Sequence, residues 1–187
     1  MSQTTYILHG GATSRPCEWN DRFFKKIVEG LPSGATVLVV YFAVTEDRWP
    51  SLLDQDRERF ERFANQAICV ELAQKDTFMK QVREADAIYL RGGHTPRLLE
   101  EVKKHPGFVD AIKGKVIAGS SAGVYILSTY YHSTDQGGVF AGLGVLPIRS
   151  ITHSDEGDPA RIEALNAYPQ ELELVRIPET EFRIMTI

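Results

Sequence analysis

Short runs of β-branched and other apolar residues alternate with longer amphipathic stretches along most of the chain. The clearest run is Thr36–Phe42, which is almost wholly apolar, as expected of a strand buried on both faces. Between the runs, apolar residues such as Phe24, Ile27 and Leu31 recur at helical spacing. This alternation is typical of an α/β protein in which helices cover both faces of a mostly parallel sheet. We therefore predict a single doubly wound domain, a three-layer sandwich, over residues 1–187.

The pattern of the chain changes after the first five expected strands. Those strands are 6–8, 36–42, 68–72, 87–90 and 115–118, and the expected helices are 23–31, 52–67, 77–85, 96–102, 109–113 and 122–127. Residues 132–144 are rich in glycine and lack a period, so we expect a loop or a short hairpin there. Beyond them we expect a strand at 148–152, a helix at 159–167 with Asp158 as its N-cap, and strands at 172–177 and 182–187.

Charge and composition argue against several classes of function. The net charge of −4 is spread along the chain, without a basic run that would favour nucleic acid. Cys17 and Cys69 form no CxxC pair, and the histidines lack ligand spacing, so we expect no disulfide, metal or cofactor. No apolar run approaches the roughly 20 residues that span a bilayer, and the first residues do not look like a secretion signal. We expect a cytoplasmic protein that binds neither nucleic acid nor membranes.

The sequence Gly-Ser-Ser-Ala-Gly at residues 119–123 lies between an expected apolar strand and an expected apolar helix. Ligands bind to such sheets at the carboxyl ends of the strands. A G-x-S-x-G sequence there is the pattern of a nucleophile elbow, a tight turn that presents a serine beside the free amides of a helix N-terminus. Ser121 occupies the central position, so we predict it as the nucleophile. Ser120 is expected to have a packing or supporting role.

A serine hydroxyl is a weak nucleophile and needs a general base that a third group orients. His153 follows the expected strand 148–152, which would bring its imidazole to the same sheet edge as Ser121. We therefore predict His153 as the base. His9 and His94 lie beside glycine turns and could line the same pocket.

Several stretches of the chain match one known family. They are Ile88–Thr95 with its Arg-Gly-Gly-His-Thr end, the Ala-Gly-Ser-Ser-Ala-Gly turn at 118–123, Gly142–Pro147 followed by His153 and Arg161, and Arg176–Glu179. Together they resemble the peptidase E (alpha-aspartyl dipeptidase) and cyanophycinase family of serine peptidases. The resemblance covers most of the chain and implies a flavodoxin-like fold related to class I glutamine amidotransferases.

The resemblance also implies a catalytic triad. Ser121 would attack the substrate, His153 would act as general base and then as acid, and Glu179 would orient His153. The order serine, histidine, glutamate differs from that of the α/β-hydrolases, in which the acid precedes the histidine. From the residues alone, Glu179 does not stand out among the late acids, and Asp135 in the loop after the elbow helix is an alternative triad acid.

The same resemblance implies an oxyanion hole built from the backbone amides of Ala122 and of Gly92 or Gly93. The Gly-Gly turn follows the expected strand 87–90, so its amides would lie at the same sheet edge as the elbow.

The expected substrates are short peptides with an N-terminal aspartyl residue, and the family suggests a homodimer. An aspartyl side chain calls for an arginine, because the guanidinium group can bind a carboxylate through two hydrogen bonds. Arg161, Arg149 and Arg91 are candidates, and Thr95 and His94 are further residues that could contact the substrate.

Three alternatives remain open at this point. A cyanophycinase-like isopeptidase would need acids to hold an arginine, and the loop 155–158 (Asp-Glu-Gly-Asp) could supply them. A non-catalytic binding protein on an amidotransferase-like fold would leave the serine unreactive. An esterase is suggested by the segment 9–11 (His-Gly-Gly), which superficially resembles a lipase oxyanion motif, although the short chain leaves no room for a lid domain.

Overall fold

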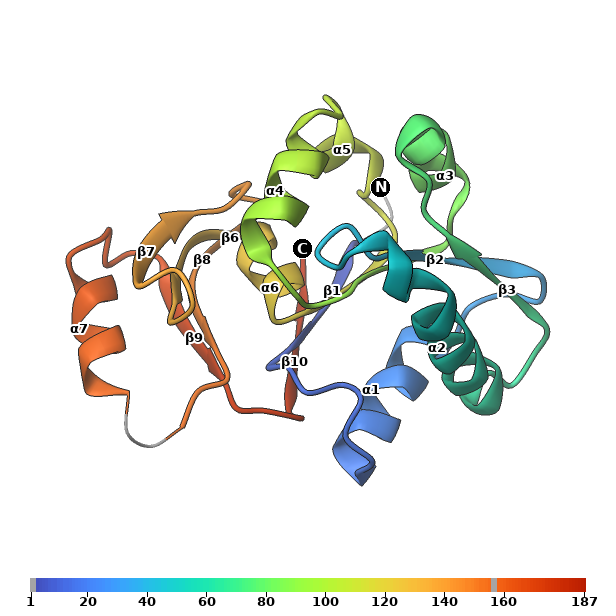
Figure 1. The fold of residues 1–187 in the computed structure, drawn as a ribbon, viewed down its shortest axis with the longest axis horizontal. Coiled ribbons are helices and arrows are strands. Elements are labelled where there is room, and N and C mark those ends of the chain that lie inside the picture. Colours follow the sequence, from blue (N-terminus) through green and yellow to red (C-terminus); the bar gives the residue numbers. More distant parts are fainter. Residues whose placement is uncertain (1–2, 156–157) are drawn as a thin grey trace.

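A computed structural model of the chain describes residues 3–155 and 158–187. Its centre is a sheet with the strand order β10-β1-β5-β4-β2-β3 (Figure 1). The parallel strands are β1 (Thr5–His9), β2 (Ala35–Val40), β3 (Ile68–Leu72), β4 (Ala87–Leu90) and β5 (Val116–Ser120). Strand β10 (Phe182–Thr186) pairs with β1 in the antiparallel direction. The predicted α/β class with a mostly parallel central sheet is confirmed.

Helices cover both faces of this sheet (Figure 1). One face carries α1 (Glu18–Val28) and α2 (Trp49–Phe63), which follows the 3-10 turn η1 (Glu46–Arg48). The other carries α3 (Phe78–Glu84) after the turn η2 (Lys75–Thr77), α4 (Thr95–Lys103), α5 (Phe108–Ala111) and α6 (Ala122–Leu127). Strand β4 is buried along its whole length between the two layers, which accounts for its continuous apolar sequence. No helix among the described residues is long and apolar enough to cross a membrane.

A second sheet, with the strand order β7-β6-β8-β9, lies beside the first (Figure 1). It consists of β6 (Ser128–Ser133), β7 (Gly138–Ala141), β8 (Leu146–Thr152) and β9 (Glu173–Ile177). The region predicted as a loop or short hairpin is thus mainly the β6–β7 hairpin, whose first strand begins directly at the end of α6. The helix α7 (Pro159–Asn166) packs on this sheet. Asp158 is its N-cap, as predicted, but the Asp158 side chain binds Arg161 and not the helix amides.

Candidate active site

Ser121 lies on the sharp turn between β5 and α6. Its backbone has φ +48° and ψ −105°, a conformation that residues other than glycine rarely adopt. The Ser121 amide donates a 3.0 Å hydrogen bond to the carbonyl of His9. The flanking glycines allow this turn. A Cβ atom on Gly119 would lie 2.7 Å from the backbone of Gly123, and one on Gly123 would lie 2.3 Å from the carbonyl oxygen of Leu90. The G-x-S-x-G spacing therefore reflects close backbone contact on both sides of the serine.

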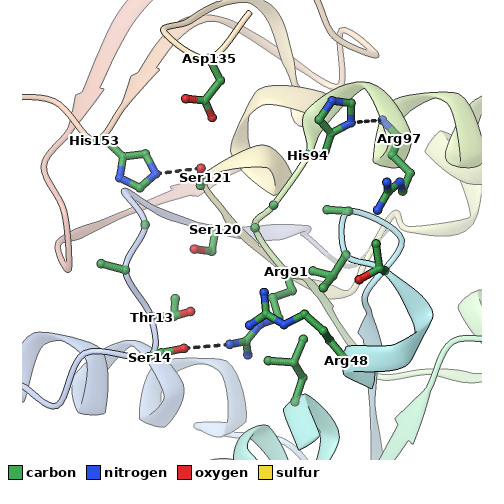
Figure 2. A pocket seen from close by; sticks show the side chains of 18 residues that line it. Thr13, Ser14, Arg48, Arg91, His94, Arg97, Ser120, Ser121, Asp135 and His153 are labelled. Carbon is green, nitrogen blue, oxygen red and sulfur yellow. Dashed lines mark hydrogen bonds between the residues drawn. The ribbon is translucent and has the colours of Figure 1, made fainter. Parts of the chain in front are cut away.

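His153 and Glu179 reach Ser121 from the second sheet. The Nε2 atom of His153 lies 2.9 Å from Oγ of Ser121, and the Nδ1 atom lies 2.9 Å from Oε1 of Glu179 (Figure 2 shows the first of these contacts). His153 directly follows β8, and Glu179 lies in the turn between β9 and β10. The side chains of His153 and Glu179 are 42% and 40% exposed, so this chain of polar groups is open to solvent on one side.

The segment 9–11 (His-Gly-Gly) joins these parts of the site through its backbone. Its three consecutive carbonyl groups accept hydrogen bonds from the amides of Ser121, His153 and Thr180, at 3.0, 2.9 and 3.0 Å. Thr180 directly follows Glu179 in the sequence. One short stretch at the end of β1 thus holds the backbone at or next to all three residues of the chain of polar groups.

Neither glycine of this segment leaves room for a side chain. A Cβ on Gly10 would lie 1.8 Å from the carbonyl oxygen of Pro178, and one on Gly11 would lie 2.1 Å from Cε1 of His153. Their amides are also engaged, because Gly10 donates to the carbonyl of Glu181 and Gly11 donates to the Nδ1 atom of His9. The segment therefore offers no free amides for an oxyanion, in contrast to the lipase motif that it resembles.

The His9 side chain is fully buried and does not line the pockets around Ser121. Since its Nδ1 atom accepts the Gly11 amide, Nε2 carries the proton and donates to Oδ1 of Asn20 at 2.8 Å. Burial lowers the pKa of His9 from 6.5 to about 4, although the bond to Asn20 acts in the opposite direction. The Oγ atom of Ser120 lies 3.4 Å from Nδ1, so Ser120 belongs to this buried network.

Glu179 is held in its ionised form. The hydrogen bond from His153 lowers the pKa of Glu179 below its usual value, partial burial opposes this, and a 2.6 Å hydrogen bond from Arg15 lowers the pKa further. Asp135, the alternative acid, forms no hydrogen bond or ion pair with His153 within the described part of the chain and borders the pockets in front of Ser121. Arg15 lies in the irregular loop after the segment 9–11, where no periodic pattern marked it.

Free backbone amides lie beside Ser121. A Cβ on Gly92 would be 3.2 Å from Cβ of Ser121, so the Gly-Gly turn after β4 approaches the serine closely. Across residues 3–155 and 158–187, the amides of Gly92 and Gly93 donate no hydrogen bond. Ala122 is the first residue of α6, where helix geometry leaves the amide without an intrahelical partner. Gly92 and Ala122 thus lie next to Ser121, and all three residues predicted for an oxyanion hole have unused amide donors.

Two pockets meet at Ser121 and His153. The larger, of about 540 Å³, extends from these residues to the starts of α2 and α4 and includes His94 (Figure 2). The smaller, of about 210 Å³, extends toward the second sheet and α7. It is lined by Gly93, Thr95, Ser121, Tyr125, Ser133, Thr134, Asp135, Thr152, His153 and Arg161.

The predicted arginines have different surroundings. Arg161 borders the smaller pocket, where it donates to the carboxylate of Asp158 and to the carbonyl of Thr152. Arg91 borders the larger pocket, but it is buried in an ion pair with Asp56 and also donates to Ser14. Arg149 lines neither pocket. Its buried guanidinium group donates to the carbonyls of Leu165 and Leu172 and so braces α7 against the second sheet.

The structure describes Asp155 and Asp158 of the acidic loop 155–158, and Glu156 and Gly157 lie outside the described residues. Asp158 pairs with Arg161 through its carboxylate, which leaves it engaged within the protein.

The family model of peptidase family S51 matches residues 6–181. The chain belongs to this family. Membership makes it a peptidase, in agreement with the resemblance in the sequence. Among curated proteins, none matches the sequence.

Solved structures show how the fold of this S51 member is shared. A peptidase from an acI-B1 Actinobacterium has a TM-score of 0.70 and 20% identity, over 97% of this chain and 83% of that one. A Listeria monocytogenes EGD-e protein described as a peptidase E protein has a TM-score of 0.66 and 17% identity, over 100% of this chain and 98% of that one. At these identities the likeness concerns the fold.

Proposed function

We propose that this S51 member is a serine peptidase that hydrolyses short peptides, in particular dipeptides, that carry an N-terminal aspartyl residue. The observation that supports it most is the continuous chain of polar contacts, each 2.9 Å long, from Ser121 through His153 to Glu179. This is the arrangement that activates a serine for acyl transfer.

The reaction follows from the roles of these groups. His153 takes the Ser121 proton at Nε2 as Oγ attacks the peptide carbonyl, and ionised Glu179 holds the other ring nitrogen and stabilises the imidazolium. The amides of Ala122 and of Gly92 or Gly93 stabilise the oxyanion. His153 then gives its proton to the leaving amine, and an acyl-enzyme remains on Ser121. Water attacks this ester with His153 again as base, which releases the acid and restores the serine.

The choice of an N-terminal aspartyl residue is supported by charge around the smaller pocket. Arg161, whose guanidinium group is paired on one side with Asp158, lies at its wall, and Thr95 and Tyr125 add hydroxyl groups, a set that suits a short carboxylate side chain. The carboxylate of Asp135, which has no hydrogen bond within the described residues, borders both pockets and suits the ammonium group of a peptide N-terminus.

The test is release of free amino acid from Asp-Leu, Asn-Leu, Glu-Leu, Ala-Leu and β-Asp-Arg. We expect cleavage of Asp-Leu and loss of all activity in Ser121→Ala. Ser120→Ala is the matched control, because it removes a neighbouring hydroxyl that faces His9 and leaves Ser121 in place. Cleavage of β-Asp-Arg alone would favour the isopeptidase.

A fluorophosphonate probe separates an enzyme from a binding protein. It should label wild type and Ser120→Ala but not Ser121→Ala. A folded wild-type protein that neither cleaves a peptide nor takes the label would contradict the proposal.

A further inference from the structure

The larger pocket has an arginine-rich wall on the side away from His153 (Figure 2). Arg48 reaches into it from the end of η1, at the N-cap of α2, and Arg97 reaches into it from the first turn of α4. Neither residue is used by the reaction described above. The third arginine there, Arg91, is already neutralised by its buried partner Asp56.

Arg48 and Arg97 carry charge that the protein leaves uncompensated. Within the described part of the chain, neither guanidinium group forms a salt bridge or a hydrogen bond, and both residues are exposed. Arg97 also borders a neighbouring hollow with Glu46 and Glu101. Those two acids are engaged with other cations, at 2.6 Å from Lys75 and 2.8 Å from Lys104.

The remaining lining of the pocket has little negative charge. Asp135 is the one acidic residue among those that line it, and it lies on the opposite side, near His153 (Figure 2). Val44 and Leu52 add apolar surface beside the arginines. The pocket thus combines the reacting groups at Ser121 with an apolar wall and two free cations. Its volume of about 540 Å³ is that of a small-molecule site.

We infer that Arg48 and Arg97 bind the C-terminal carboxylate of a dipeptide whose second residue occupies the larger pocket. This inference rests on the proposed function, which places the aspartyl side chain in the smaller pocket and leaves the larger one for the leaving amino acid. A guanidinium group binds a carboxylate through directed hydrogen bonds, and an apolar wall suits a residue such as leucine. The pair therefore selects dipeptides over amidated or longer peptides, which lack a carboxylate at this point.

Binding can be measured without catalysis by placing every variant in the Ser121→Ala background. Calorimetry with Asp-Leu and with Asp-Leu amide gives two dissociation constants for each protein. We expect the parent to bind Asp-Leu at least about tenfold more tightly than the amide, as for a charge-assisted pair at an open site. Adding Arg48→Gln and Arg97→Gln together should weaken Asp-Leu binding to the level of the amide and leave the amide affinity unchanged. Arg83→Gln, on the exposed surface of α3, is the matched control and should retain the preference.

Each outcome bears on the inference. A preference for Asp-Leu that persists in the double variant, equal affinity of the parent for the two peptides, or no binding of either would overturn it. Failure of wild type to hydrolyse Asp-Leu, with the binding preference intact, would instead count against the proposed function and leave the carboxylate subsite standing.

Discussion

The central sheet presents Ser121 from one continuous piece of chain, whereas the second sheet presents His153 and Glu179 from two separate turns. Strand β5, the elbow and α6 are successive in sequence and almost wholly buried. His153 and Glu179 follow β8 and β9, and their side chains are two-fifths exposed. The proposed nucleophile is therefore placed by local packing, while its proposed partners depend on how the two sheets are connected. The segment 9–11 makes this connection between the two sheets, and we call it the joint.

Gly11→Ala should have the largest effect on this joint. The new Cβ would overlap the His153 ring, so we expect a folded protein in which the imidazole is displaced and kcat/KM falls on the order of 10⁴-fold. Gly30→Ala is the control, since its φ of +78° is also positive but a Cβ there meets no atom within 4 Å. Steady-state hydrolysis and thermal unfolding should be measured on both. Full activity in Gly11→Ala would refute this account of the joint.

Glu179→Gln should reduce kcat on the order of 10³-fold, less than loss of a fully buried triad acid, because solvent reaches Glu179. Asp135→Asn makes the same chemical change at the other candidate acid. We expect it to raise KM about tenfold with kcat nearly unchanged, as for a group that stabilises the bound substrate and the transition state equally. Comparing kcat and KM for both variants shows which acid serves His153. A larger fall in kcat for Asp135→Asn would reverse the assignment.

His9 should make the joint sensitive to acid. Because its pKa is about 4 in the folded protein and 6.5 ordinarily, the unfolded chain takes up a proton first as the pH falls. Stability is therefore fully present above pH 6.5 and is lost between 6.5 and 4, by about 3 kcal/mol at most. Urea unfolding at pH 7, 6 and 5 should show a shallower loss in His9→Asn than in wild type. Equal slopes would mean that His9 does not control this response.

Arg15→Gln should have the smallest effect. The side chains of Arg15 and Glu179 are 58% and 40% exposed, and such pairs contribute at most about 1 kcal/mol. We expect kcat/KM to fall less than about fivefold and the fall to diminish in high salt, because salt screens exposed charges. A loss comparable to that of Glu179→Gln would instead make Arg15 essential to the orientation of His153.

The contrast between the local elbow and the connection of the two sheets also separates what the sequence predicts from what it does not. The elbow is local, so a strand, two glycines and a helix sufficed to predict the turn on which Ser121 lies and to point to Ser121 as the candidate nucleophile. The buried strands of the central sheet were predicted for a similar reason, since a run such as β4 is apolar throughout. Helix α1 begins at Glu18, earlier than predicted, because its first turn, Glu-Trp-Asn-Asp, has a single large apolar residue and so shows no apolar period.

Strands and site residues that are brought together by contacts between distant parts of the chain leave no local pattern in the sequence. Strand β6 has the sequence Ser-Thr-Tyr-Tyr-His-Ser, so its strand character and its place in a second sheet were not predicted. His153 was suggested by its position after a strand, but Glu179 was distinguished only by the family resemblance. Arg48 and Arg97 follow central strands, at the sheet edge where ligands bind, and this was the one signal that could have revealed them.

The backbone torsions of Ser121 and His153 have a consequence for how such a protein evolves. Both residues have positive φ, +48° and +49°, and neither is a glycine. Conformations of this kind cost on the order of 1–3 kcal/mol each, which the surrounding fold must supply. A glycine at either position would relieve the strain, but it would also remove a side chain that the proposed reaction needs. Under the proposed mechanism, selection for stability alone would therefore favour inactive descendants, and selection for the reaction would keep these two side chains at strained positions of the backbone.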